Sequence, residues 1–222
     1  MAKKKKEAVF FEEDAFYHVY NRAVGGQRLF KSDENFRFFL RKFAYYLYPV
    51  VQTYAYCLLG NHFHLLIRVR TTTDILVWNR EQSKNPFLPE TDSDSSVVHE
   101  VVNKQFSRFF QSYATAFNKQ HSRFGTLFQK PFKRVAVRSE QYLMQLIFYI
   151  HANPQRHEII GDFRNWTWSS YQSILSDKKS RLQQKEIIEL FGGRKNFVDY
   201  HADYQRSIEM EQLVEPLAFF QS

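Results

Sequence analysis

The sequence predicts an α+β fold in which a mostly antiparallel sheet is covered by helices. Along the 222 residues, segments that alternate like strands are interspersed with longer segments of helical spacing, in the order strand, helix, strand, strand, helix, strand, helix. The second and third strands are separated only by Gly60-Asn61, which favours a hairpin. Hairpin strands combined with crossing helices are typical of α+β sandwiches.

The first half of the chain supplies the first strand, a helix and the hairpin. Residues 16–23 alternate like a strand, and Gly25-Gly26 then marks a turn. Within residues 33–48, aromatic and leucine side chains recur at helical spacing until Pro49, which predicts a helix that ends there. The apolar segments on both sides of Gly60-Asn61 predict the two strands of the hairpin.

The second half begins with a polar segment and continues with helices and short strands. Residues 79–96 contain two prolines and an Asp/Ser tract, which predicts an exposed loop insertion. Residues 97–120 have the pattern of a long helix, and residues 123–138 are expected to hold short strands around a glycine and a proline. A last helix is expected to begin after Ser139, which can cap it, and to be stopped by Pro154.

These elements form one main domain with an appendage at each end. We expect residues 1–12 to be a basic flexible arm, residues 13–175 to be the main domain, and residues 176–222 to be a helical tail. A single cysteine, Cys57, excludes an intramolecular disulfide and a multi-thiolate zinc site. Because the sequence has neither a transmembrane-length apolar segment nor a signal-peptide pattern at Met1, we expect a cytoplasmic protein without membrane contact.

Two histidines one residue apart are the most informative feature of the predicted hairpin. Because side chains alternate along a strand, His62 and His64 point to one face of the sheet and Phe63 to the other. Two imidazoles on a rigid strand can supply half of a metal site, although such a pair is also common as an ordinary polar sheet face. His18 on the first strand either approaches this pair or occupies a polar sheet position.

Positive charge is concentrated in one part of the chain. The formal net charge is +8, and residues 101–138 contain eight basic residues and no Asp or Glu. Aromatic side chains are interleaved with these charges, a mixture that suits nucleic acid because it pairs phosphate neutralisation with base stacking. A solvated basic face and an aromatic helix core remain the alternative interpretation. The candidate DNA-binding residues are Lys119, Arg123, Lys130, Lys133, Arg134 and Arg138.

The last predicted helix carries a tyrosine and an amide on one face. Tyr142, Tyr149 and Asn153 share that face through their i, i+7 and i+11 spacing. Taken alone, Tyr149 is equally consistent with a half-buried aromatic residue, and Asn153 with a helix-end residue.

Three motifs together resemble the single-tyrosine HUH transposases and, within them, the REP-associated tyrosine transposases. The first is Gly-Asn-His-Phe-His-Leu-Leu at residues 60–66, which is similar to the histidine strand of that family. The second is Tyr-Ile-His-Ala-Asn-Pro at residues 149–154, which is similar to its tyrosine helix. The third is Trp-Thr-Trp-Ser-Ser-Tyr at residues 166–171, which resembles the turn after that helix. The three occur in family order within residues 15–171.

The resemblance implies a fold and a set of site residues. It implies an HUH endonuclease fold, with a ferredoxin-like or RRM-like antiparallel sheet, over residues 13–175, followed by a C-terminal helical extension. It implies that Tyr149 is the nucleophile and that His62, His64 and Asn153 hold a divalent metal ion. Mg²⁺ or Mn²⁺ is the expected ion, and imidazole ligands also suit Ni²⁺ or Zn²⁺ in a crystal.

The resemblance also implies an activity. Family members cut single-stranded DNA beside a hairpin, through a covalent 5′-phosphotyrosine that a 3′-hydroxyl later attacks in strand transfer. The expected partner is single-stranded, REP-like hairpin DNA, and the expected location is the bacterial cytoplasm, with nucleoid association when DNA is bound. The protein is expected to be a monomer or a homodimer. Two other functions stay open, namely a catalytically idle hairpin-binding regulator and a metal-dependent nuclease that does not use Tyr149.

Overall fold

The computed structural model describes residues 9–82 and 95–203. Its centre is a four-stranded antiparallel sheet with the strand order β2-β3-β1-β4. The strands are β1 (Phe16–Arg22), β2 (Val51–Leu58), β3 (His62–Val69) and β4 (Lys133–Val137). This is the order of a ferredoxin-like sheet, and it confirms the predicted α+β fold class.

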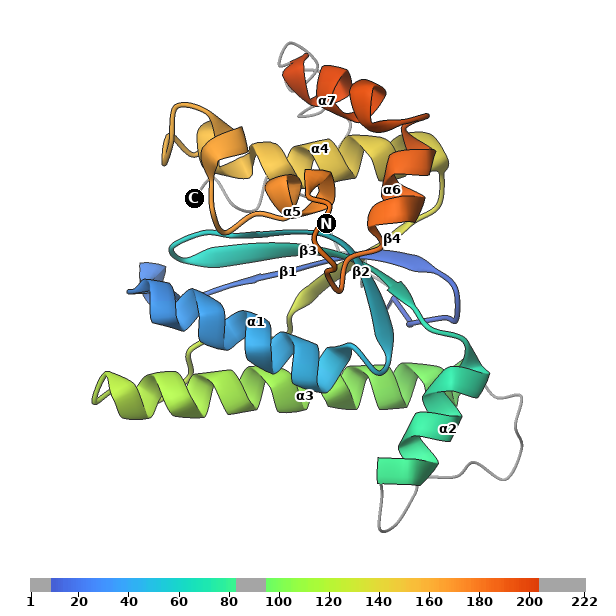
Figure 1. Ribbon diagram of the computed structural model, residues 1–222. Coiled ribbons are helices and arrows are strands. Elements are labelled where there is room, and N and C mark those ends of the chain that lie inside the picture. The colour runs from blue at the N-terminus through green and yellow to red at the C-terminus, as the bar shows by residue number, and fades with distance from the viewer. Residues whose placement is uncertain (1–8, 83–94, 204–222) are drawn as a thin grey trace, which may run out of the picture.

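Helices cover both faces of the sheet (Figure 1). One face is covered by α1 (Asp33–Leu47) and α3 (Ser95–Gln120), and α2 (Thr72–Gln82) lies beside the N-terminal end of α3. The other face is covered by α4 (Glu140–Arg156), with the short helices α5 (Tyr171–Leu175), α6 (Gln184–Leu190) and α7 (Arg194–Ala202) around it. Two 3-10 turns, η1 (Val24–Gly26) and η2 (Phe163–Asn165), complete the described elements. None of the described helices combines the length and the apolar character needed to cross a bilayer.

The sheet separates two hydrophobic cores. The core on the α1 and α3 side contains Phe39, Phe63 and Phe109, all fully buried. The core on the α4 side contains Cys57, Leu146 and other apolar side chains of α4 to α7. Both faces of β3 are therefore buried, which explains why its sequence is an almost continuous apolar run.

Helices extend into both ends of the polar segment before the long helix. Residues 79–82 are the last turn of α2, and Ser95-Ser96 open α3, so the expected loop 79–96 is wrong at both ends. Residues 83–94 lie outside the described residues, as do residues 1–8 of the expected basic arm. The expectation of a flexible arm is wrong for residues 9–12, because Phe11 is fully buried in the core on the α1 and α3 side. Helix α2 was missed because the fully buried Ile75 and the buried Leu76 are among the few apolar anchors in a largely polar helix.

Two further boundaries differ from the expectation. Residues 123–132 form a turn with one isolated bridge, Ala23 to Phe128, and only β4 is a strand. Helix α4 continues through Pro154 to Arg156, instead of stopping before the proline. Proline removes one N–H from the helix, but the N–H groups of His157 and Ile159 bond the carbonyls of Asn153 and Pro154, so the last turn is still closed.

Candidate active site

The alternation of β3 divides the His-Phe-His motif between the two cores. Phe63 packs among aromatic rings of the α1 and α3 side, with its centroid 5.0 Å from that of Phe39. His62 and His64 lie on the α4 side, where the ring of Tyr149 meets His64 edge-on at 5.7 Å. The predicted orientation of the two histidines is therefore confirmed, and the tyrosine helix is the element that covers them.

Hydrogen bonds orient both imidazoles through their Nδ1 atoms. His62 Nδ1 lies 2.6 Å from Asn61 Oδ1, and His64 Nδ1 lies 2.9 Å from His18 Nε2. An amide oxygen only accepts, so His62 Nδ1 carries the proton and Nε2 keeps its lone pair. For His64 to ligate through Nε2, its Nδ1–H must donate to His18, which gives His18 the role of orienting that ring.

His18 reaches this position because β1 pairs with β3. The register places Tyr20 opposite His64 and Arg22 opposite His62, so alternate β1 side chains share the histidine face. His18 is buried and its ring stacks on that of His64 at 5.1 Å. Of the two interpretations of His18, the structure therefore supports the approach to the histidine pair.

Burial keeps the histidines neutral. Removal from water lowers the pKa of His62 to about 3, and His157 and Arg22 add to this effect. The pKa of His64 is lowered well below its usual value, first by burial and then by His18 and neighbouring positive charge. Neutral imidazole is the form that binds a metal ion, so the environment suits ligation.

Tyr149 lies in the α4 side core with only 8% of its side chain exposed. Burial raises the pKa of Tyr149 to about 12, while the charge of Arg156 and a side-chain hydrogen bond with Asn153 act in the opposite direction. The Arg156 guanidinium lies 5.1 Å from the centroid of the Tyr149 ring. The tyrosine is thus neutral as it stands, with one cation placed where it favours the phenolate.

Asn153 is held one helical turn after the tyrosine. Its Nδ2 donates to the backbone oxygen of Tyr149 at 2.7 Å, and its side chain is 1% exposed. The sequence predicts that Asn153, His62 and His64 are the ligands of a metal ion. An amide oxygen with two imidazoles would be a mixed oxygen and nitrogen donor set, which suits Mn²⁺, Ni²⁺ or Zn²⁺ better than Mg²⁺. Within residues 9–82 and 95–203, no group of three His, Cys, Asp or Glu side chains could hold a metal ion. Any site here therefore needs the amide, water or substrate as a further ligand.

Two residues of the site were missed from the sequence. Arg156 lies seven positions after Tyr149, so it shares a helix face with the tyrosine and was detectable from spacing. The ring of His157 lies 4.9 Å from that of His62, although the pair is 95 positions apart. Only the contact between α4 and β3 reveals His157, because no local pattern connects the two.

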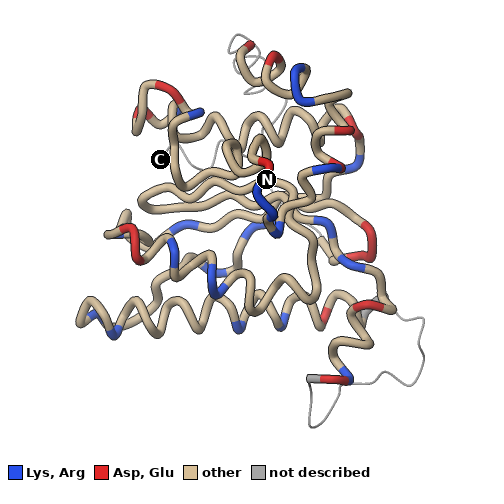
Figure 2. Tube along the Cα trace, in the orientation of Figure 1, with Lys and Arg blue, Asp and Glu red and all other residues tan. Residues whose placement is uncertain are grey.

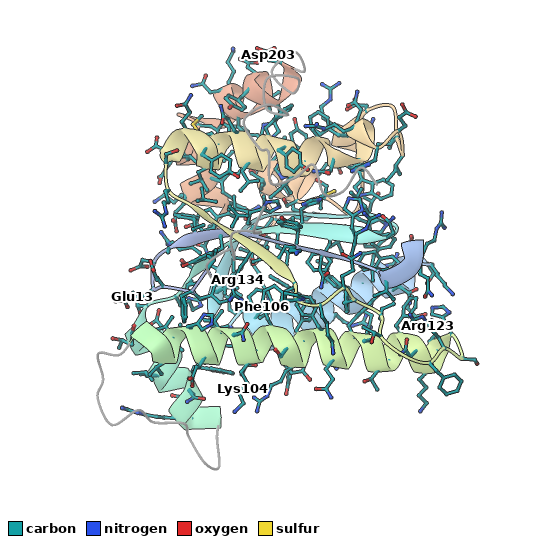
Figure 3. The ribbon with its side chains drawn as sticks, turned by 180° about the vertical axis from the view of Figure 1, so that it is seen from behind. Glu13, Lys104, Phe106, Arg123, Arg134 and Asp203 are labelled. Carbon is teal, nitrogen blue, oxygen red and sulfur yellow. The ribbon has the colours of Figure 1, made fainter. Side chains whose placement is uncertain are left out.

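The candidate DNA-binding residues fall into two groups. Lys133 on β4 pairs with Tyr20, so it lies on the histidine face, and Lys119, Lys130 and Arg138 are also exposed. Arg134 instead points to the α3 side (Figure 3), where it donates to Val9 O and Asn103 and stacks on Phe11 at 4.7 Å.

Arg123, the remaining candidate, is also bound internally. Its guanidinium donates to Gln27, Asn118, the Gly125 oxygen and the Thr126 oxygen. Arg123 and Arg134 are therefore structural residues in this fold, whatever further contacts they make.

Comparisons with known proteins support the resemblance seen in the motifs. No family model matches this chain. The chain is 25% identical over 126 residues to the "Putative REP-associated tyrosine transposase" of Haemophilus influenzae, a match that covers 56% of this chain and 60% of that protein. The alignment thus spans less than two thirds of the relative. A solved structure of a REP-associated tyrosine transposase bound to a REP hairpin is similar with a TM-score of 0.47 and 15% identity, over 80% of this chain and 87% of that chain. The sequence match confirms the resemblance to REP-associated tyrosine transposases.

Proposed function

We propose that this protein cuts single-stranded DNA beside a hairpin and rejoins it through a covalent phosphotyrosine at Tyr149, as in DNA transposition or a domesticated form of it. The observation that carries the proposal is the edge-on contact of Tyr149 with His64 at 5.7 Å. The His62 ring lies 5.2 Å from that of His64, and Asn153 is hydrogen-bonded to Tyr149. The similarity to a transposase relative supports a DNA endonuclease or transposase activity at the family level.

The chemistry conserves one phosphodiester bond at each step. The Tyr149 oxygen attacks phosphorus, the bond from phosphorus to the 3′ oxygen breaks, and the 3′ oxygen takes up a proton to become a hydroxyl. The 5′ end of the DNA is then a phosphate ester of Tyr149. In the second step the oxygen of a 3′-hydroxyl bonds to that phosphorus, the bond from phosphorus to the Tyr149 oxygen breaks, and the proton of the hydroxyl passes to Tyr149. No nucleotide cofactor is required, because the bond energy is stored in the ester.

The residues around Tyr149 have distinct tasks in this scheme. Arg156 stabilises negative charge as the phenol loses its proton, since the guanidinium already lowers the pKa of Tyr149. Asn153 bonds the Tyr149 carbonyl and side chain, which restricts the position of the ring. His18 fixes the His64 ring through their 2.9 Å hydrogen bond.

His62, His64 and Asn153 are proposed to hold the divalent ion. When bound, the ion polarises the scissile phosphate and stabilises charge on its oxygens. The lowered pKa values of both histidines keep their rings ready to ligate at neutral pH. Lys133, on the same face as Tyr20, is the basic residue best placed to contact the DNA backbone near Tyr149.

A second candidate function is hairpin binding without catalysis. It is favoured by the burial of Tyr149, which is 8% exposed and has a pKa raised to about 12. A tyrosine this shielded is a weak nucleophile until the bound DNA changes its surroundings.

The two functions are separated by a covalent-adduct assay. A hairpin oligonucleotide with a single-stranded flank, labelled at its 3′ end, is incubated with protein and Mn²⁺ or Mg²⁺ and analysed on a denaturing gel. We expect a labelled protein band with the wild type and with Tyr142→Phe, a matched tyrosine on the same helix, and none with Tyr149→Phe or with EDTA. An adduct that survives Tyr149→Phe contradicts the assignment. Cleavage without adduct indicates a plain nuclease, and binding without cleavage indicates the idle relative.

A further inference from the structure

A groove with mixed polar and apolar walls lies on the opposite side of the sheet from Tyr149. It runs between the exposed side of α3 and the segment that leads into β4, and it has a volume of about 970 Å³. Its walls carry amide, hydroxyl and ammonium groups, including those of Ser107, Gln111, Thr115, Gln129 and Lys130. Such groups can donate to and accept from base edges and phosphates, while Phe110, Phe128 and Phe132 add apolar surface. The groove thus combines the polar and apolar contacts that a nucleic acid strand can use.

An exposed aromatic residue directly precedes two residues that line the groove, Gly125 and Thr126. Phe124 is 93% exposed, the highest value among the large apolar side chains of residues 9–82 and 95–203. Its neighbour Gly125 lines the groove. A phenyl ring in water gains nothing for folding, whereas an exposed aromatic face beside a groove with basic neighbours is suited to stacking an unpaired base.

The turn that presents Phe124 is rigidly held. Arg123 Nε donates to Gln27 at 2.7 Å, and its Nη atoms donate to Asn118, Gly125 and Thr126 at 2.8, 3.2 and 2.6 Å. Asn118 Nδ2 also donates to the Gly125 oxygen at 2.9 Å. The guanidinium therefore fixes the turn from inside, and Phe124 is held outward without a loss of order on binding.

The charge near the groove is complementary to a polyanion. Residues 101–138, which supply all the lining residues except Asn21, contain no Asp or Glu. Lys104 and Arg108 are exposed on α3, and Lys119 and Lys130 are exposed at its end and on the facing wall. Figure 2 shows basic positions spaced along α3, and Figure 3 places Lys104 and Arg123 toward opposite ends of that helix.

The groove is continuous in sequence with the site of Tyr149. Its wall ends at Phe132, and the next residue, Lys133, begins the edge strand β4 opposite Tyr20. The ring of Tyr20 lies 4.8 Å from that of His18, inside the candidate active site. A nucleic acid strand that leaves the groove past Lys130 thus reaches β4, the edge strand beside the histidine face.

We propose that this groove binds a single-stranded segment of nucleic acid, with one unpaired base stacked on Phe124 and the backbone contacted by Lys130. The choice of single-stranded DNA as the ligand rests on the proposed function, because the groove itself carries only the stacking ring and the positive charge. Arg123 acts as a positioning residue that presents Phe124, and the groove anchors DNA that continues around β4 toward Tyr149.

Fluorescence anisotropy tests the proposal without any covalent step. The probe is a fluorescein-labelled oligothymidylate of about 12 nucleotides, and every protein carries Tyr149→Phe. We expect Phe124→Ala to weaken binding by about 5- to 150-fold with no change in melting temperature, and Phe124→Trp to restore it. Lys130→Gln should lower the slope of log affinity against log salt by about 0.7.

Matched variants on other surfaces control for exposure and charge. Tyr45→Ala removes another exposed ring, 73% exposed on α1, and Lys185→Gln removes an exposed ammonium on α6. Both should bind like the parent protein. Equal affinities of Phe124→Ala and Tyr45→Ala for the probe would overturn the proposal. It would also be overturned if a duplex probe bound as tightly as the single-stranded probe and its affinity were unchanged by Phe124→Ala.

The outcome is independent of the adduct assay. Weaker binding by Phe124→Ala together with no adduct in the wild type would support the groove and contradict the proposed function. An adduct at Tyr149 together with unchanged binding by Phe124→Ala would support the proposed function and contradict the groove.

Discussion

The Tyr149 hydroxyl is subject to opposing influences from the residues around it. Burial among aromatic rings raises its pKa to about 12, and the Arg156 charge and the Asn153 hydrogen bond lower it. Since one pKa unit corresponds to about 1.4 kcal/mol, each of these contacts bears directly on how readily the phenolate forms. The nucleophile is therefore defined by its neighbours as much as by its own chemistry.

Arg156→Gln is expected to slow adduct formation. Without the guanidinium the pKa of Tyr149 rises, and the phenolate fraction at pH 7 falls about tenfold for each unit of that rise. The rate of adduct formation is measured between pH 6 and about pH 9, and the curve for Arg156→Gln should be displaced to higher pH. Arg156→Lys keeps the charge and should lie close to the wild type. A rate that returns to the wild-type value at saturating DNA would show that Arg156 acts on DNA binding instead.

Helix α4 is held in place by a buried chain of hydrogen bonds next to the tyrosine. His201 Nδ1 donates to Phe197 O at 2.7 Å, so His201 Nε2 accepts from His151 Nδ1 at 2.9 Å. His151 Nε2 then accepts from Ser170 Oγ at 2.7 Å, and Ser170 Oγ accepts the N–H of Tyr56. Each bond dictates the direction of the next. The chain connects α7, α4, the turn before α5 and the edge strand β2.

Ser170→Ala should destabilise the protein without touching the active site. It leaves the buried His151 Nε2 without its partner and removes the acceptor of the Tyr56 N–H, and an unsatisfied buried polar group costs about 1–3 kcal/mol. The free energy of unfolding is measured by urea titration. Ser107→Ala, at an exposed serine of α3, is the matched control and should change it by less than about 0.5 kcal/mol. An unchanged free energy in Ser170→Ala would mean that the hydrogen-bond chain does not contribute to folding.

At the scale of the whole molecule, the C-terminal segment belongs to the fold. The boundary expected at residue 175 separates a domain from a tail, yet Phe197 and His201 are fully buried in the α4 side core. Tyr54 on β2 also donates to Glu186 on α6 at 2.5 Å, and Arg68 on β3 pairs with that carboxylate. The described part of the tail, up to residue 203, is thus a structural support for the helix that carries Tyr149.

Acid is expected to destabilise this protein already below about pH 6.5, because two buried histidines must take up protons on unfolding. Burial lowers the pKa of His201 to about 4 and of His18 to about 3, against about 6.5 in the unfolded chain. The unfolded state binds these protons more readily, so stability is complete above about pH 6.5 and is lost as the pH falls toward 4. For His201 alone the loss over this window is about 3 kcal/mol.

Urea unfolding at pH 7 and pH 5 measures this dependence. His201→Gln should be less stable at pH 7 but should lose less stability between the two values, because it has one titrating group fewer. His121→Gln removes a partly exposed histidine and should leave the pH dependence nearly unchanged. The same free energy of unfolding at both pH values in the wild type would contradict the prediction.

The sequence by itself determined the features that follow from local geometry. The period of two along β3 placed His62 and His64 on one face, and the helical period placed Tyr149 and Asn153 together. The hairpin at Gly60-Asn61, the class of fold and the motifs of the resemblance were equally visible. Backbone periodicity fixes these relations whatever the rest of the chain does.

The tertiary structure decided which surfaces meet. The strand register brings His18 next to His64, and the packing of α4 on the sheet brings Tyr149 to the histidines. The hydrogen bonds of Arg123 hold the turn in which Phe124 is exposed. Lys133 and Arg134 point in opposite directions because side chains alternate along a strand. Only the packing of helices on the two faces of the sheet determines that Lys133 is the one on the side of the candidate active site. Such contacts join residues tens of positions apart, and burial and hydrogen bonding across the whole core select them.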